Sequence, residues 1–171
     1  TPIKSSAASD VYKRQLVALD QLVKFWAEHS LSQVDTIALI PGVFHLTYVQ
    51  NFGAAFNTMN NQRLLLVVLT SAVLLVIFVL LLLGKLRSPW MVVSWSLILA
   101  GGAGNLIDRL FREGGYVVDL FDFRLINFPV FNVADICVTV GMALFLIYFI
   151  FIERKEHRRF EIRQEIKRHE Q

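Results

Sequence analysis

Two aspartates of this sequence lie where chain segments meet the expected boundary of a membrane. Asp119 lies in the apolar segment Tyr116–Phe121, and Asp135 lies one turn into the long apolar run after Phe131. If both reach the same depth, two carboxyl groups share a poorly solvated site, where one holds a proton and the other stays charged. The charged group can activate water while the protonated group polarises a carbonyl and later serves the leaving amine. Such a pair would hydrolyse a peptide without a nucleophilic side chain.

Each aspartate also has a structural reading. Asp135 alone would be stabilised by the positive end of a helix dipole, and Asp119 alone would suit a turn. Spacing by itself leaves both readings open.

Further polar residues occur inside or beside apolar runs, where ionisable groups are costly unless they have a partner. Asp20 and Lys24 are four residues apart and share a helix face, so they can neutralise each other as a structural ion pair. Asn105, Asp108 and Arg109 also share a face and follow the small-residue run 100–104. Small residues allow close helix contact, so helix packing is the alternative to a functional role here.

The composition requires lipid as the solvent for much of the chain. Of its 171 residues, 55% are hydrophobic and only 18% are charged, which exceeds the apolar share of ordinary soluble domains. The basic residues gather near the expected membrane ends, so a nucleic-acid partner is not expected. The single cysteine, Cys137, cannot form an intramolecular disulfide, and we assign it no catalytic role.

Other catalytic chemistries lack their motifs. The four histidines have no ligand spacing with cysteine or acidic residues, so no metal is expected. Serine-hydrolase and nucleotide-binding motifs are also missing from the sequence, and no cofactor is expected.

Four membrane spans are predicted. Residues 64–83 form an apolar run that carries no charge after Arg63, long enough as a helix to cross about 30 Å of hydrocarbon. Residues 90–109 follow Pro89, which suits a first helical turn. Residues 133–152 form the third apolar run, and residues 16–28 resemble part of a fourth.

The distribution of lysine and arginine predicts the orientation. The tail 153–171 carries seven such residues and the short loop 84–88 carries two, whereas residues 27–62 carry none. Basic loops stay on the cytoplasmic side. Both termini are therefore expected inside, with residues 27–63 and 110–132 outside.

The outer segments have the pattern of short strands and turns. Pro41-Gly42 is a turn signal, and residues 43–49 alternate aromatic and β-branched side chains. The predicted fold is an all-α membrane protein, a four-transmembrane-helix bundle in residues 16–152, with a small extracytoplasmic sheet resting on the membrane. Residues 1–15, with several ionisable groups, are expected to be a non-native or artefactual segment.

Five segments in this order resemble the signature motifs of lipoprotein signal peptidase, the type II enzyme family. They are Asp20-Gln21-Leu22-Val23-Lys24, Asn51-Phe52-Gly53-Ala54-Ala55-Phe56, the stretch 101–109, Val117-Val118-Asp119, and Phe131-Asn132-Val133-Ala134-Asp135.

The resemblance implies a multi-pass bacterial inner-membrane peptidase with a β-cradle and an active site at the outer face. The implied substrate is a prolipoprotein whose cysteine bears diacylglycerol, cut just before that cysteine. Membrane lipids are the other expected partner, and the enzyme is expected to be a monomer.

The resemblance also assigns roles to residues. It makes Asp119 and Asp135 the catalytic pair. Residues that orient the pair or bind substrate are Asn51, Gly53, Asn105, Arg109 and Asn132. Structural polar residues are Asp20, Lys24 and Asp108.

Two other functions use the same features. A small transporter or proton-relay protein would bind ions with the buried carboxylates. A non-enzymatic assembly factor would use the basic tail for docking. The order of the five motifs favours the peptidase.

Overall fold

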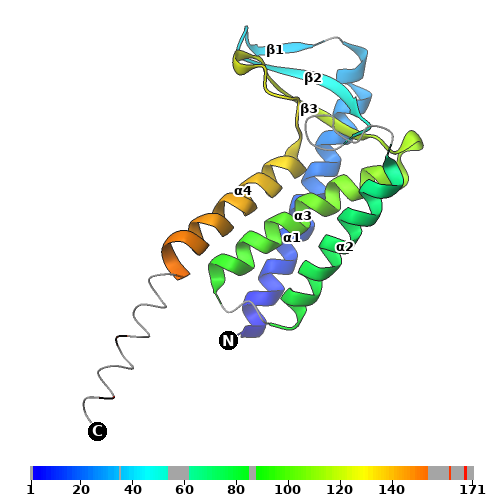
Figure 1. Ribbon diagram of the computed structural model, residues 1–171. Coiled ribbons are helices and arrows are strands. Elements are labelled where there is room, and N and C mark those ends of the chain that lie inside the picture. Colours follow the sequence, from blue (N-terminus) through cyan, green and yellow to red (C-terminus); the bar gives the residue numbers. More distant parts are fainter. Residues whose placement is uncertain are drawn as a thin grey trace.

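The computed structural model describes residues 2–34, 36–53, 62–84, 88–153, 162 and 168. Within them, helices lie side by side and a small sheet covers one end (Figure 1). The helices are α1 (Pro2–His29), α2 (Arg63–Leu82), α3 (Pro89–Phe111) and α4 (Val133–Ile147), and α4 continues into a π-helical segment, Tyr148–Glu153. The strands are β1 (Ile37–Ile40), β2 (Phe44–Asn51) and β3 (Val117–Phe123), and 3-10 turns cover Leu31–Gln33, Glu113–Gly115 and Arg124–Ile126.

Three of the described helices are long and apolar enough to cross a membrane. They are α2, α3 and the stretch Val133–Phe151, which match three of the predicted spans in position and length. Helix α1 has 28 residues and continues back to Pro2, through the segment expected to be non-native. Because α1 carries several charges, the fourth span stays a prediction. The origin of residues 1–15 also stays a prediction. Most of the tail 153–171 lies outside the described residues.

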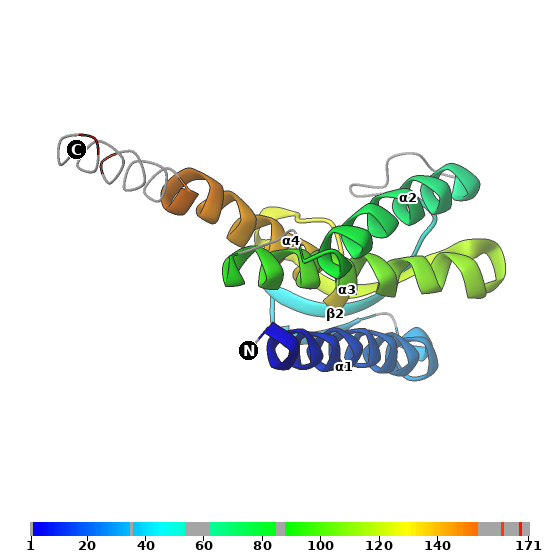
Figure 2. The ribbon, with the colours of Figure 1, turned by 90° about the horizontal axis from the view of Figure 1, so that it is seen from below.

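Helix α3 is the centre of the bundle. It contacts α1, α2 and α4, and Figure 2 shows it between α1 and α2. Helices α1 and α3 run toward the sheet, whereas α2 and α4 run away from it (Figure 1). The sheet therefore lies where α1 and α3 end and where α2 and α4 begin.

The sheet is antiparallel in the order β1-β2-β3, so the predicted strand structure after Pro41-Gly42 is confirmed. Gly42 has a φ of 74°, a conformation that favours glycine. Its backbone N–H donates to His45 Nε2 over 3.1 Å. The turn thus closes the hairpin between β1 and β2.

The two faces of β3 have different surroundings. Val118 and Leu120 pack against Ala27 and Leu31 near the end of α1, and all four are almost completely buried. Side chains alternate along a strand, so Asp119 lies on the opposite face. That face looks into a groove between the helices. Packing of β3 on α1 therefore directs Asp119 toward the groove.

A backbone bridge joins β3 to the segment that enters α4. The N–H of Phe121 donates to Phe131 O over 2.8 Å, and the N–H of Phe131 donates to Phe121 O over 3.0 Å. Asp119 lies two residues before this bridge and Asp135 lies four residues after it. The bridge therefore brings both aspartates to one place.

Glycines allow the helices to approach closely, as the small-residue run predicted. A Cβ added at Gly101 would lie 2.3 Å from the backbone oxygen of Ala134. A Cβ at Gly104 would lie 2.5 Å from Asp20 Oδ2. Helix α3 therefore meets α4 and α1 where a methyl group does not fit.

Gly101→Ala should destabilise the protein by about 1–3 kcal/mol, because the new methyl meets a backbone oxygen that cannot move alone. Gly102→Ala is the matched control, since its Cβ would meet the flexible side chain of Leu74 at 2.6 Å. Both changes raise helix propensity equally, so the difference in melting temperature in detergent isolates the clash. Equal melting temperatures for the two variants would contradict this account.

Candidate active site

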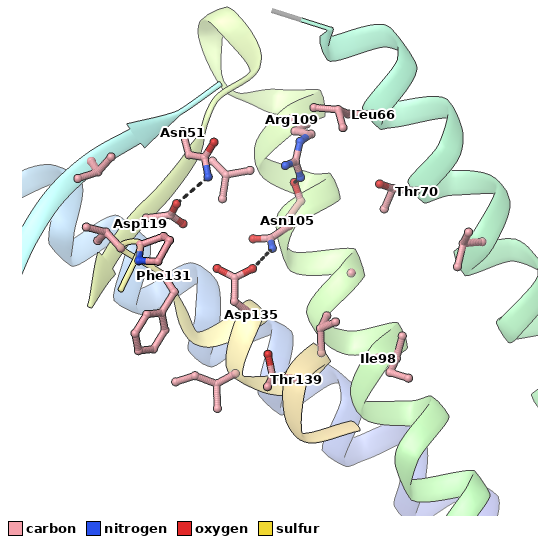
Figure 3. Close-up of a pocket in the computed structure, with 18 of the residues that line it drawn as sticks. Asn51, Leu66, Thr70, Ile98, Asn105, Arg109, Asp119, Phe131, Asp135 and Thr139 are labelled. Carbon is pink, nitrogen blue, oxygen red and sulfur yellow. Dashed lines mark hydrogen bonds between the residues drawn. The ribbon is translucent and has the colours of Figure 1, made fainter. Parts of the chain in front are cut away.

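Asp119 and Asp135 lie at one end of a single groove, brought there from β3 and the first turn of α4. Asp119 is only 2% exposed, whereas Asp135 is half-buried. Figure 3 shows both carboxyl groups in the groove beneath the sheet. The structure thus brings together the two residues that the sequence singled out.

Two asparagine side chains hold the carboxylate of Asp119. Asn51 Nδ2 donates to Oδ2 over 2.9 Å, and Asn132 Nδ2 donates to Oδ1 over 2.6 Å. Asn51 Oδ1 accepts from the backbone N–H of Gly53 over 2.9 Å, which fixes the direction of the amide. Asp119 is therefore held by donors at both oxygens.

Asn132 contacts both aspartates. As the residue before α4, its Oδ1 accepts from the N–H of Asp135 over 2.9 Å, and its own N–H donates to Asp135 Oδ2 over 3.1 Å. This reciprocal pair is a capping box. Because the same side chain also donates to Asp119, the start of α4 and the placement of both carboxyl groups depend on one residue.

Asn105 links the site to a buried cluster of charges. Its Nδ2 donates to Asp135 Oδ1 over 2.8 Å, and its Oδ1 accepts from Lys24 Nζ over 2.8 Å and from Asn132 Nδ2 over 3.1 Å. An ammonium group only donates, so Lys24 fixes the amide with its oxygen inward. Asn105 must then present its NH₂ group to Asp135.

Lys24 lies fully buried between two carboxylates. Its Nζ is 2.9 Å from Asp20 Oδ2 and 2.9 Å from Asp108 Oδ2. Asp20 Oδ1 also accepts from the N–H of Ala134 over 2.9 Å, and Asp108 Oδ2 accepts from the N–H of Val118 over 3.3 Å. The cluster therefore ties α1, α3, α4 and β3 together, and the sequence reading of Asp20 and Lys24 as an ion pair is confirmed.

Arg109 lines the groove but bonds to backbone oxygens. One nitrogen donates to Gly53 O over 2.9 Å and another to Asn105 O over 3.3 Å. Within the described ranges, no hydrogen bond joins it to either aspartate. It holds the segment after Asn51 in place and leaves its charge near the two carboxyl groups.

The surroundings of Asp119 raise the pKa of its carboxyl to about 7. Burial is the main cause, and the nearby charge of Asp135 adds to it. Hydrogen bonds from Asn51 and Asn132 act in the opposite direction. A proton on Asp119 is therefore available close to neutral pH, as acid and base chemistry by a carboxyl pair requires.

The groove has a volume of about 1210 Å³. Its walls come from α2 and α4 and its floor from α3, with the ends of β2 and β3 above (Figure 3). Most lining side chains are apolar, and the charged and amide side chains gather at the sheet end. Such a groove suits an apolar chain that presents one polar group to the aspartates.

Two supporting residues were missed from the sequence. Gln21 Nε2 donates to Asp108 Oδ1 over 3.1 Å and to Gly104 O over 3.2 Å. Arg63 caps the end of α3, with bonds of 2.7 Å to Arg109 O and 3.1 Å to Leu110 O. In the sequence, Gln21 could have been noticed because it lies between Asp20 and Lys24, and Arg63 because it is a single arginine at the start of an apolar run.

Comparisons of the sequence with known proteins agree on one family. A family model described as signal peptidase (SPase) II matches residues 14–151. A lipoprotein signal peptidase of Streptococcus thermophilus (strain CNRZ 1066) is 43% identical, over 83% of this chain and 92% of that protein. One of Clostridioides difficile (strain 630) is 43% identical, over 82% of this chain and 93% of that protein.

A solved structure of a bacterial membrane enzyme has the same fold. It superposes with a TM-score of 0.78 at 28% sequence identity, over 84% of this chain and 88% of that chain. A second structure, also of a bacterial membrane enzyme, gives a TM-score of 0.75 at 28% identity over 85% and 94%.

Lys24→Met should lower the free energy of unfolding by about 3–5 kcal/mol, because buried Asp20 then loses its cation and buried Asp108 keeps only Arg112, whose Nε lies 3.2 Å from Oδ1. Thermal unfolding in detergent measures the loss. Adding Asp20→Asn and Asp108→Asn to Lys24→Met should recover part of it, since the unpaired charges are then gone. A single variant as stable as the wild type would show that Lys24 does not hold the cluster.

The stability of the wild type should fall as pH rises from about 4 to about 7. The folded protein keeps the Asp119 proton up to about pH 7, whereas the unfolded chain releases it near pH 3.8, so in this window rising pH favours the unfolded state. Asp119→Asn should show a shallower decline. The readout is the slope of melting temperature against pH, and parallel slopes for the two proteins would contradict the raised pKa.

Proposed function

The chain belongs to the signal peptidase II family, and from this premise we propose that it cleaves prolipoproteins with Asp119 and Asp135 as an aspartic catalytic pair. Membership makes the chain a membrane peptidase that removes signal peptides from prolipoproteins. The observation that carries the aspartic assignment is the bonding of one residue, Asn132, to both carboxyl groups at the end of an apolar groove.

The two aspartates take different roles in this proposal. Asp119 holds the proton, since burial and the neighbouring charge raise its pKa to about 7. Its O–H donates to the oxygen of the scissile carbonyl, while ionised Asp135 takes a proton from the attacking water. The water oxygen bonds to the carbonyl carbon, and the proton taken up by Asp135 passes to the leaving amine nitrogen as the C–N bond breaks. Atoms and charges balance with water as the sole co-reactant.

The neighbouring amides serve orientation. Asn51 and Asn132 hold Asp119, and Asn105 holds Asp135. Arg109 places a positive charge by the groove and anchors Gly53, whose carbonyl accepts from it. Positioned groups of this kind lower the barrier because they do not reorganise during the reaction.

The distribution of lysine and arginine supports the orientation that we propose in a bacterial inner membrane. The sheet end lies on the outer side, and both termini lie on the cytoplasmic side. The signal peptide and the diacylglyceryl tails stay at hydrocarbon depth, while the scissile bond reaches the aspartates near the outer boundary, where water enters. We propose that the enzyme acts as a monomer and needs no metal or cofactor.

No observation favours the transporter or the assembly factor. The aspartates, the asparagines and the Lys24 cluster all lie at the sheet end of the bundle, and the lining of the groove beyond them is largely apolar. A proton or ion path would need polar groups along its length. The groove instead fits an apolar chain cut at one end.

Asp119→Asn and Asp135→Asn should each lower kcat by at least about a thousandfold, since each removes a proton donor or acceptor from the reacting atoms. Cleavage of a purified diacylglyceryl prolipoprotein in detergent measures the effect. In the wild type, kcat/KM should fall as pH rises through about 7, as Asp119 loses its proton. Near wild-type turnover by either folded variant would refute the assignment.

Asp122→Asn is the matched control. Asp122 lies three residues after Asp119 but bonds to Thr47 and Arg124 on the sheet, at 2.8 Å and 2.7 Å. Its replacement should leave kcat close to that of the wild type. A chelator arm belongs in the same assay, and activity that is lost with chelator and restored by zinc would overturn the metal-free mechanism.

A further inference from the structure

Two threonine hydroxyls interrupt the apolar walls of the groove. Thr70 lies on α2 and Thr139 lies on α4, and both line the cavity. Figure 3 shows them on opposite walls, with the oxygen of Thr70 toward the groove and that of Thr139 on the side of Asp135. The mechanism proposed above uses neither of them.

Thr139 lies one helical turn beyond Asp135 on the same face of α4, farther from the sheet. Thr70 lies one turn beyond Leu66, across the groove. Nearby lining side chains are apolar: Leu69, Val73, Leu74, Ile98, Val138 and Val140. The two hydroxyls are therefore the polar side chains that the groove offers next to the aspartates on the membrane side.

Neither hydroxyl has a hydrogen-bond partner in the described part of the chain. A hydroxyl on a helix commonly bonds to the carbonyl four residues earlier, and Ser94 does so, donating to Trp90 O over 2.7 Å. Thr70 and Thr139 make no such bond, so each keeps a free donor and free acceptor sites.

A signal peptide bound in the groove needs hydrogen-bonding side chains on the membrane side of the aspartates. A helical peptide hides its backbone, so the scissile bond reaches the aspartates only where the helix has ended. The residues just before that bond then present unpaired N–H and C=O groups. In an apolar groove, each unpaired group is costly.

We propose that the hydroxyl oxygens of Thr139 and Thr70 accept hydrogen bonds from backbone N–H groups in the non-helical segment of the signal peptide immediately before the scissile bond. Thr139 faces residues that lie one turn to the membrane side of Asp135, and Thr70 faces the same stretch from the opposite wall. The inference rests on the proposed function, because it gives the groove a signal peptide as occupant. It adds a second pair of residues that selects an extended backbone.

A lipid ester carbonyl could instead accept the hydrogen of either hydroxyl, so the experiment must separate the two sources. A peptide backbone offers N–H donors, which the diacylglyceryl group lacks. Replacing one amide by an ester in the substrate removes one backbone N–H and leaves the lipid unchanged. Coupling between that change and a threonine variant identifies the backbone.

Thr139→Val and Thr70→Val should each lower kcat/KM for a diacylglyceryl prolipoprotein peptide by roughly five- to tenfold, the loss expected for one hydrogen bond. Thr139→Ser and Thr70→Ser keep the hydroxyl and should stay within about twofold of the wild type. A substrate with an ester in place of one amide among the last two residues before the scissile bond should show a similar loss with the wild type. On that substrate, Thr139→Val should cause little further loss.

Valine variants within twofold of the wild type would overturn the inference. A full loss on both the amide and the ester substrates at each position would also overturn it, because the hydroxyls would then bind something other than this backbone. Failure of the wild type to cleave, or full turnover by Asp119→Asn, would refute the proposed function and this inference with it. Cleavage by the wild type and none by Asp119→Asn, with unaffected valine variants, would refute the inference alone.

Discussion

The pairing of Lys24 inside the bundle is the interaction on which the rest of the site depends. An ammonium group without water must have every hydrogen accepted, and its acceptors are Asp20, Asp108 and the amide oxygen of Asn105. The two carboxylates also accept hydrogen bonds from backbone N–H groups of α4 and β3, so their positions depend on these elements. The amide of Asn105 donates to Asp135. A structural charge cluster thereby determines the direction from which the carboxyl of Asp135, a member of the proposed catalytic pair, receives its hydrogen bond.

The residues that begin α4 also determine the geometry of the site. A helix needs partners for its first N–H groups, and here Asn132 and Asp135 supply them to each other. Asn132 is completely buried and also donates to Asp119. The position of one aspartate relative to the other is therefore coupled to helix initiation, a local event with little freedom. Strain in the loop before Asn132 would disturb the cap and the pair together.

The sequence was sufficient for three of the helices, for the strands of the outer segments and for the position of the two aspartates, because each leaves a local signal. Apolar runs of helical length predicted α2, α3 and α4, and carboxyl groups at the ends of such runs stood out. Side-chain directions were not predictable, since they depend on pairing between distant segments. A register shift between Leu46 and Val49 places Asn51 opposite Val117, with its amide on Asp119. Arg109 reaches Gly53 across the groove for the same reason, and the family resemblance implied only that it orients the pair or binds substrate.

Helix α2 takes no part in the hydrogen bonds described above that position the aspartates, and it forms one wall of the groove. The groups that position the aspartates come from α1, α3, α4 and the sheet, whereas α2 is attached to α3 through Leu74 beside Gly102 and through Arg63 on the carbonyls at the end of α3. Within the described part of the chain, no hydrogen bond or ion pair joins its remaining groove face to Asp119 or Asp135. Substitutions on that face alter the width and polarity of one wall without moving Asp119 or Asp135. Under the proposed function, substrate preference can therefore change along α2 while the geometry of the two aspartates, held by buried charges and a helix cap elsewhere, stays constant.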